Sequence, residues 1–155
     1  MKVLAKFPTR GRPQRFLSTL RGWIESADKP EDVTFVISYD YDDATMTPDV
    51  IAATQGLACE VLCFAGASKT KIEAVNADID RVGGWDVLLV ISDDMFCRRK
   101  GWDSLIIQNM NTHFPDTDGS LWFYDGSQRK INTIPCLGRK YFYRFCTDNK
   151  NETNT

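Results

Sequence analysis

The sequence predicts an α/β fold in which a mostly parallel sheet carries helices on both faces. Three observations lead to this prediction. Apolar or β-branched runs alternate with segments of helical spacing, the run at 86–91 is apolar almost throughout, and polar loops follow the expected strands. Alternating strands and helices form parallel sheets, and a near-continuous apolar strand is typical of one covered on both faces. A length of 155 residues suits one such domain.

The chain begins with a strand, a loop and a helix. Residues 2–7 form an apolar run that predicts a strand. The two prolines and the glycine of 8–13 predict a loop, because they disfavour regular pairing. Apolar residues then recur on one helical face from Phe16 to Ile24, so we expect a helix that ends near Ala27.

A second strand and helix follow. The β-branched run 33–38 predicts the strand, and the acidic residues of 39–45 predict a loop. Thr47 followed by Pro48 is a helix start signal, because threonine caps helices and proline fits their first position. We expect this short helix to continue to Leu57.

The middle of the chain repeats the alternation. Residues 60–64 predict a third strand, followed by a Gly-Ala-Ser turn. Apolar residues at helical spacing predict one helix over 72–82, which stops at two glycines. The apolar strand at 86–91 leads directly into Ser92, Asp93 and Asp94.

The last third is less regular. We expect a helix over 102–110, strands over 121–124 and 131–137, and a helix or loop over 139–145. Residues 147–155 are polar throughout and predict a disordered tail. One domain is therefore expected over 1–146.

Composition excludes several classes of protein. A net charge of −2 argues against a dedicated nucleic-acid binder. The longest apolar runs have five residues, whereas a membrane span needs about 20. The N-terminus has no signal-peptide core, because Lys6 interrupts it. The five cysteines are odd in number and form no CxxC, so we expect reduced thiols in a cytoplasmic protein.

Charges of opposite sign separate along the N-terminal third. Residues 1–24 carry six basic side chains and no acid, and residues 31–49 carry six acidic side chains and no base. This asymmetry suits a cationic loop beside an acidic one, around an anionic ligand and a metal. Two ordinary solvated faces would show the same pattern.

The loops that follow the first four expected strands contain the unusual residues. Ligands of parallel sheets bind at the carboxyl ends of the strands, so we expect these loops to meet at one edge. Asp93 and Asp94 are paired carboxylates of the kind that hold Mg²⁺ or Mn²⁺ with substrate phosphates. A helix cap or turn would use the same residues.

Further candidates come from the other loops. Thr9, Arg10 and Arg12 suit a nucleotide, although the loop matches neither a P-loop nor GxGxxG. An aspartate after the second strand accepts hydrogen bonds from a base or a ribose. Each candidate also has an ordinary explanation, namely a solvated basic loop, turn chemistry or polar helix surface. The further candidates are Asp40, Asp42 and Asp43 in the loop after the second strand, and Lys71 and Asn76 on the third expected helix.

Trp85 and Trp102 flank the aspartate pair. Buried packing is the expected role of both, and Trp102 could instead form one wall of a sugar site.

Taken together, these motifs resemble glycosyltransferases of the GT-A (Rossmann-like) fold, close to family 2. The resemblance covers about residues 2–140. It depends on the order of five motifs rather than on any one of them: FPTRGRP at 7–13, ISYDYDD at 37–43, KIEAVN at 71–76, SDDM at 92–95 and GWD at 101–103.

The resemblance implies a nucleotide-diphosphate sugar donor, an unknown acceptor and a divalent metal, Mn²⁺ or Mg²⁺. By the same resemblance, Pro8, Thr9 and Arg10 contact the nucleoside and Asp40 recognises the base, with help from Asp42 or Asp43. Lys71 and Asn76 face the donor. Asp93 and Asp94 match the DXD-like element, in which the second acid holds the metal and the first approaches the ribose or sugar.

The chain departs from this family at its C-terminal end. Such domains usually exceed 200 residues, so we expect a short or C-terminally truncated member. Asp125 and Asp148 are the late acids available as a base, and neither is assigned. Two alternatives to a sugar transferase remain open. They are a domain that binds a nucleotide without turnover, and a nucleotidyltransferase, which the missing Gly-rich loop disfavours.

Overall fold

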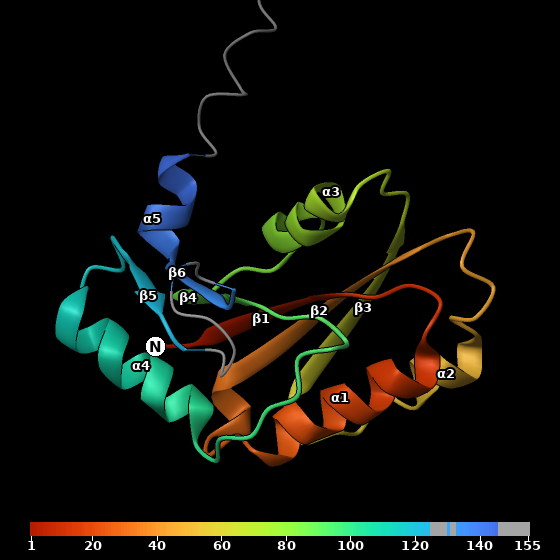
Figure 1. Ribbon diagram of the computed structural model, residues 1–155, viewed down its shortest axis with the longest axis horizontal. Coiled ribbons are helices and arrows are strands. Elements are labelled where there is room, and N and C mark those ends of the chain that lie inside the picture. Colours follow the sequence, from red (N-terminus) through yellow and green to blue (C-terminus); the bar gives the residue numbers. More distant parts are fainter. Residues whose placement is uncertain (125–129, 131–132, 146–155) are drawn as a thin grey trace, which may run out of the picture.

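A six-stranded sheet runs through the computed structural model, which describes residues 1–124, 130 and 133–145 (Figure 1). The strand order is β3-β2-β1-β4-β6-β5. The first four strands in this order are parallel, and β6 is antiparallel to both of its neighbours. The bounds along the chain are β1 Val3–Pro8, β2 Val33–Asp40, β3 Glu60–Gly66, β4 Val87–Val90, β5 Ser120–Trp122 and β6 Pro135–Gly138. The predicted mostly parallel sheet is confirmed.

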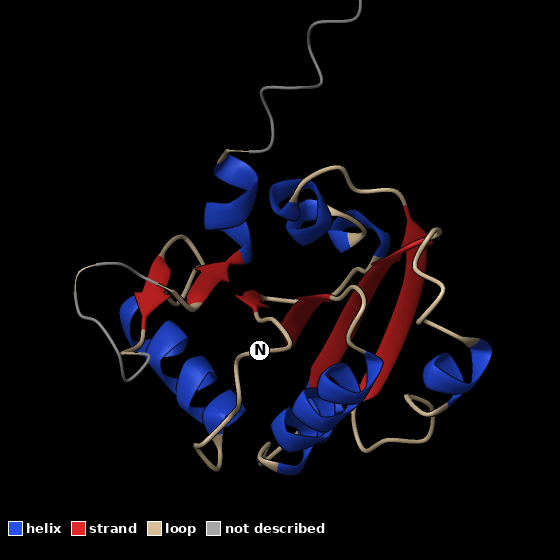
Figure 2. Ribbon diagram, turned by 45° about the vertical axis from the view of Figure 1, so that its right-hand side comes forward, coloured by secondary structure: helices blue, strands red, loops and turns tan. Residues whose placement is uncertain are grey.

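Helices cover both faces of this sheet, as the sequence predicts (Figures 1 and 2). One face carries α1 (Pro13–Glu25), α2 (Pro48–Ala52) and α4 (Trp102–His113). The other carries α3 (Lys71–Asn76), the 3-10 turn η2 (Ile79–Arg81) and α5 (Arg139–Arg144). A further 3-10 turn, η1 (Pro30–Asp32), precedes β2.

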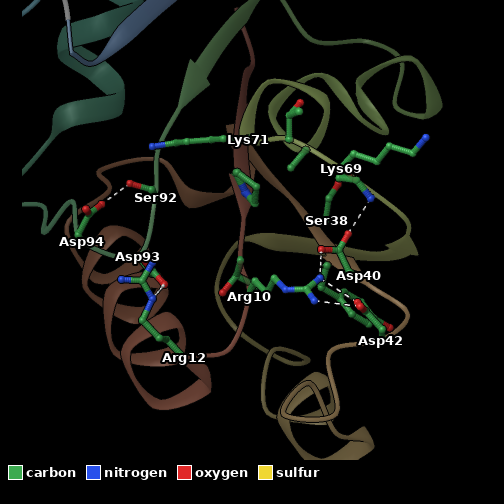
Figure 3. A pocket seen from close by; sticks show the side chains of 16 residues that line it. Arg10, Arg12, Ser38, Asp40, Asp42, Lys69, Lys71, Ser92, Asp93 and Asp94 are labelled. Carbon is green, nitrogen blue, oxygen red and sulfur yellow. Dashed lines mark hydrogen bonds and ion pairs between the residues drawn. The ribbon is translucent and has the colours of Figure 1, made fainter.

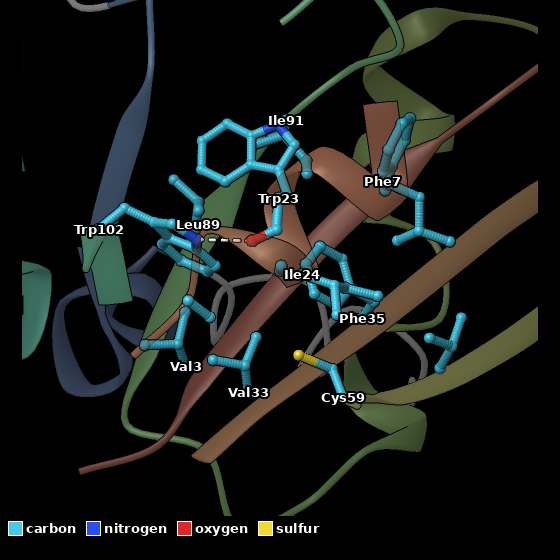
Figure 4. Close-up of a cluster of buried hydrophobic side chains, with 14 of the residues drawn as sticks. Val3, Phe7, Trp23, Ile24, Val33, Phe35, Cys59, Leu89, Ile91 and Trp102 are labelled. Carbon is cyan, nitrogen blue, oxygen red and sulfur yellow. Dashed lines mark hydrogen bonds between the residues drawn. The ribbon is translucent and has the colours of Figure 1, made fainter. Parts of the chain in front are cut away.

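Alternation along the strands divides the core into two clusters. Val3, Ala5 and Phe7 face α1, whereas Leu4 faces the side of α3 and α5. In the larger cluster, the indoles of Trp23 and Trp102 pack edge to face at 5.0 Å. Trp102 Nε1 also donates to the carbonyl of Trp23 at 2.8 Å (Figure 4).

Both tryptophans that flank the aspartate pair have the expected packing role. Trp102 is 4% exposed in the larger cluster, and Trp85 is 2% exposed in the smaller one. Trp102 therefore forms no wall of a sugar site.

Two predicted helices are shorter than the sequence suggests. The predicted helix at 72–82 is interrupted after Asn76, because Asp78 adopts a left-handed backbone with φ of 65° before η2 begins. Ile72, placed on its apolar face by spacing, is 74% exposed. The helix capped by Thr47 begins as predicted but ends at Ala52 rather than Leu57.

The C-terminal third agrees with the prediction where it is described. Strand β5, at 120–122, overlaps the start of the predicted 121–124, β6 covers the end of 131–137, and residues 139–144 are helical. The predicted tail at 147–155, Asp125 and Asp148 lie outside the described residues.

Four of the cysteines, Cys59, Cys63, Cys97 and Cys136, are free thiols. Burial raises the pKa of Cys59 and of Cys136 to about 12. Among the described residues, no helix is both long enough and apolar enough to cross a membrane.

Candidate functional site

A pocket of about 520 Å³ opens at the carboxyl ends of β1, β2 and β4 (Figure 3). The four loops that the sequence places at this edge all contribute to it. Clefts of this volume suit ligands of nucleotide size. The lining residues are Pro8, Thr9, Arg10, Arg12, Ser38, Tyr39, Asp40, Asp42, Ser68, Lys69, Thr70, Lys71, Ala74, Ser92, Asp93 and Asp94.

The basic and acidic segments meet at one side of this pocket. The Arg10 guanidinium donates to Asp40 and makes two hydrogen bonds to Asp42, at 2.8 and 3.0 Å. These bonds lower the pKa of Asp42 and raise that of Arg10. Arg10 therefore orders the acidic loop as well as lining the pocket.

Asp40 connects three loops. One of its carboxylate oxygens accepts from Arg10, and the other accepts from the backbone N–H of Ser68 at 2.9 Å. The backbone N–H of Tyr41 donates to Gly66 at 2.8 Å beside it. The loops after β1, β2 and β3 are therefore held in fixed relation around this carboxylate.

Asp93 lies at the opposite side and is almost fully buried. Its backbone carbonyl accepts from Arg15 Nε at 3.1 Å and Thr19 Oγ1 at 2.9 Å, so α1 fixes its position. Arg12 Nε lies 3.0 Å from Asp93 Oδ2 as an ion pair. That oxygen nevertheless accepts no hydrogen bond, and the buried hydroxyl of Thr9 also has no partner. Buried polar groups normally have partners, so the Thr9 hydroxyl is available to a ligand, and Asp93 Oδ2 can take a ligand beside its ion pair with Arg12.

Asp94 is exposed, and its carboxylate is polarised by its neighbours. The hydroxyl of Ser92 donates to it and lowers the pKa of Asp94, and the positive charges of Lys71 and Arg15 lower that pKa further. The carboxylate is therefore ionised at neutral pH.

The residues present fit a divalent ion that is completed by a substrate. Asp93 Oδ2 has no hydrogen bond and is paired only with the Arg12 guanidinium, and Asp94, the next residue, is an ionised carboxylate. Within the described parts of the chain, no cluster of three or more His, Cys, Asp or Glu side chains could hold a metal. Mg²⁺ is typically bound by one or two carboxylates together with substrate phosphates, and these two aspartates match that pattern.

Two predicted site residues lie outside the lining of the pocket. Asp43 accepts hydrogen bonds from the backbone N–H of Gly11 at 2.8 Å and from both the backbone N–H and the hydroxyl of Thr45. Burial opposes ionisation of Asp43, but these bonds outweigh it and lower its pKa. Asn76 is the last residue of α3 and is exposed. The remaining nine candidates line the pocket.

Several polar residues of the pocket were not among the predicted site residues. Ser38, Ser68, Lys69, Thr70 and Ser92 all line it. Each follows or ends an expected strand, so position at the carboxyl edge was the available signal.

No protein-family model matches the chain, and no curated protein sequence matches it. Several solved structures, however, match the fold of this chain. A mannosyltransferase from Pyrobaculum calidifontis, PcManGT, in complex with GDP-Man and Mn²⁺, superposes with a TM-score of 0.73 at 14% identity, over 92% of this chain and 46% of its own. S. aureus TarS 1-349 gives 0.61 at 16% identity, over 84% of this chain and 38% of its own.

A third match is 4-diphosphocytidyl-2C-methyl-D-erythritol synthase from Anaerococcus prevotii. It gives a TM-score of 0.59 at 11% identity, over 99% of this chain and 78% of its own. The chain thus spans less than half of the two structures described first. At these identities the likeness shows the fold, which is the α/β fold that this chain shares with GT-A-like glycosyltransferases and with nucleotidyltransferases.

Proposed function

We propose that this chain is the donor-binding part of a glycosyltransferase that uses a nucleotide-diphosphate sugar and Mn²⁺ or Mg²⁺. One observation carries the proposal. The pocket has hydrogen-bonding groups for a nucleoside at the ends of β1 and β2, and a carboxylate pair after β4. The matched mannosyltransferase, which holds GDP-Man and Mn²⁺, supports it.

The residues divide between the two ends of the ligand. Pro8, Thr9, Arg10 and Asp40 form the nucleoside end, with Asp42 ordering Arg10. At the other end, Asp93 and Asp94 would hold the metal, and Arg12 and Lys71 supply positive charge beside the diphosphate. A divalent ion bound there would neutralise charge on the departing nucleoside diphosphate.

Calorimetry with UDP-glucose and GDP-mannose, with and without Mn²⁺, tests this function. We expect metal-dependent binding of at least one donor by the native chain. Asp94→Asn should remove the metal dependence, because it removes a carboxylate charge from the pair. Asp49→Asn is the matched control, since Asp49 is exposed on α2 and lies outside the pocket. Unchanged affinity in Asp94→Asn would refute the metal assignment.

A nucleotidyltransferase is the second candidate. It is favoured by one observation, that the matched synthase is covered over 78% of its length by this chain. The products separate the possibilities. Release of a nucleoside diphosphate from a sugar donor indicates a glycosyltransferase, and release of pyrophosphate from a nucleoside triphosphate indicates a nucleotidyltransferase. Binding without either product indicates a domain that only holds nucleotides.

A further inference from the structure

A lysine is fully buried in the centre of the sheet. Lys6 is 0% exposed and lies in β1 between Val36 of β2 and Val90 of β4. Lysine is almost never fully buried unless it is paired. An apolar residue would serve the strand at this position at a lower desolvation cost. The fold therefore does not explain why a lysine is there.

The partners of Lys6 give the explanation. Its Nζ donates to the hydroxyl of Ser38, and that hydroxyl donates to Asp78 Oδ2 at 2.5 Å. Asp78 is the residue with left-handed backbone that interrupts the helix after α3, and Arg81 lies 3.2 Å from its other oxygen. Lys6 of β1 and Asp78 of the turn after α3 thus converge on the hydroxyl of Ser38 in β2.

This arrangement fixes what Ser38 can offer a ligand. A serine hydroxyl has one hydrogen to donate and two acceptor positions. Its hydrogen is committed to Asp78 and one acceptor position to Lys6. One acceptor position remains, on a residue that lines the pocket.

Ser38 lies at the nucleoside end of that pocket. It is on β2 near Asp40, whereas the aspartate pair follows β4, and β1 separates the two strands. Figure 3 shows Ser38 beside Asp40 and Lys69, with Asp93 and Asp94 on the far side.

We propose that Ser38 is a specificity residue that accepts a hydrogen bond from an N–H or O–H of the nucleoside, and that Lys6 and Asp78 are the positioning residues that make it an acceptor. This inference rests on the proposed function. It is independent of the metal end, because neither Lys6 nor Asp78 lines the pocket or contacts the aspartate pair.

Calorimetry with GDP, UDP and inorganic pyrophosphate, each with Mn²⁺, tests the proposal on the native chain and on Ser38→Ala, Ser38→Thr and Lys6→Met. We expect Ser38→Ala and Lys6→Met to weaken binding of the preferred nucleotide about tenfold, the effect of one hydrogen bond. Pyrophosphate affinity should stay the same, since it reports on the metal end. Ser38→Thr keeps the hydroxyl and should retain nucleotide affinity. The 2′-deoxy and 3′-deoxy forms of the preferred nucleotide distinguish a ribose O–H from a base N–H, because they remove only ribose donors.

Each other outcome overturns a defined statement. Native nucleotide affinity in Ser38→Ala would overturn the role of Ser38. Equal losses for nucleotide and pyrophosphate would show a purely structural role. No binding of GDP or UDP by the native chain would overturn the proposed function itself. If Lys6→Met fails to fold, the pair Ser38→Ala and Ser38→Thr still decides the question.

Discussion

At the scale of single residues, the buried Lys6 links the site to protein stability. Burial lowers the pKa of Lys6 to about 8, although the nearby charge of Asp78 opposes this change. In the unfolded chain the same group titrates near its ordinary value, about 10.4. Between these two pH values the unfolded state binds more protons than the folded state, so the contribution of Lys6 to stability rises with pH.

We therefore predict that the free energy of unfolding of the native chain rises relative to that of Lys6→Met between pH 8 and 10.5. The full gain is on the order of 3 kcal/mol. Urea unfolding at pH 7.5, 9.0 and 10.5 measures it. The comparison with the variant is needed because buried thiols act in the opposite direction above pH 9. Parallel pH profiles for the two proteins would contradict the assigned pKa.

Some residues of the candidate site could be identified from the sequence alone, and others could not. The carboxyl edge of a parallel sheet is a general ligand position, so loop residues such as Thr9, Asp40 and Asp93 could be named from the sequence. The hydrogen bonds of Arg10 to Asp40 and Asp42 could not be predicted, because Arg10 is 30 residues from Asp40 and 32 from Asp42 along the chain. The role of Lys6 could not be predicted from the sequence for a different reason. A lysine within an apolar strand gives no sign of its partners, which come from β2 and from the turn after α3.

At the scale of elements, one carboxylate connects α4 to the segment after α1. Asp103 is 0% exposed and accepts hydrogen bonds from the backbone N–H groups of Asp28 and Lys29, both at 2.8 Å. The GWD motif at 101–103 therefore has a structural role. Hydrogen bonds to a charged group contribute more than those to a neutral one.

Asp103→Ala should lower the free energy of unfolding by about 2–4 kcal/mol, because it removes two charge-assisted hydrogen bonds and leaves a buried gap. Asp103→Asn keeps one acceptor oxygen and should lose about half as much. Urea unfolding of the three proteins at pH 7 gives the comparison. A loss below 0.5 kcal/mol in the alanine variant would contradict this account.

The elements were predictable where local signals agree with the tertiary structure. Strands β1, β2 and β4 and helix α1 have their predicted places, because alternation, helical spacing and proline all indicate the same boundaries. The prediction of one continuous helix over 72–82 was wrong, because Asp78 accepts hydrogen bonds from Ser38 and Arg81 in a left-handed conformation that breaks the helix. Those bonds depend on the folded sheet, so periodicity along the chain does not reveal them.

At the scale of the whole molecule, two apolar clusters share the same strands. Leu88 and Leu89 are neighbours in β4 and are 1% and 0% exposed, but they belong to different clusters. Because one strand supports both clusters, we expect the two clusters to unfold together. The single domain expected over 1–146 stays a prediction, which the cooperativity of unfolding tests.

Leu88→Ala and Leu89→Ala form a matched pair that tests it. Each should lower the free energy of unfolding by about 2–5 kcal/mol, the cost of a buried leucine truncation. Each should also shift one common transition, seen alike by far-ultraviolet circular dichroism and tryptophan fluorescence. Separate transitions for the two probes in either variant would show two independent units.

The strand order also has a consequence for the size of the ligand. Neighbouring strands lie about 4.8 Å apart, and β2 and β4 lie on either side of β1, so their ends are about 10 Å apart. A ligand that reaches both Asp40 and Asp93 must cross the end of β1. In a nucleotide, only the phosphate chain can extend that far from the nucleoside. We therefore expect the spacing of the sheet to favour nucleotides with two phosphates over those with one.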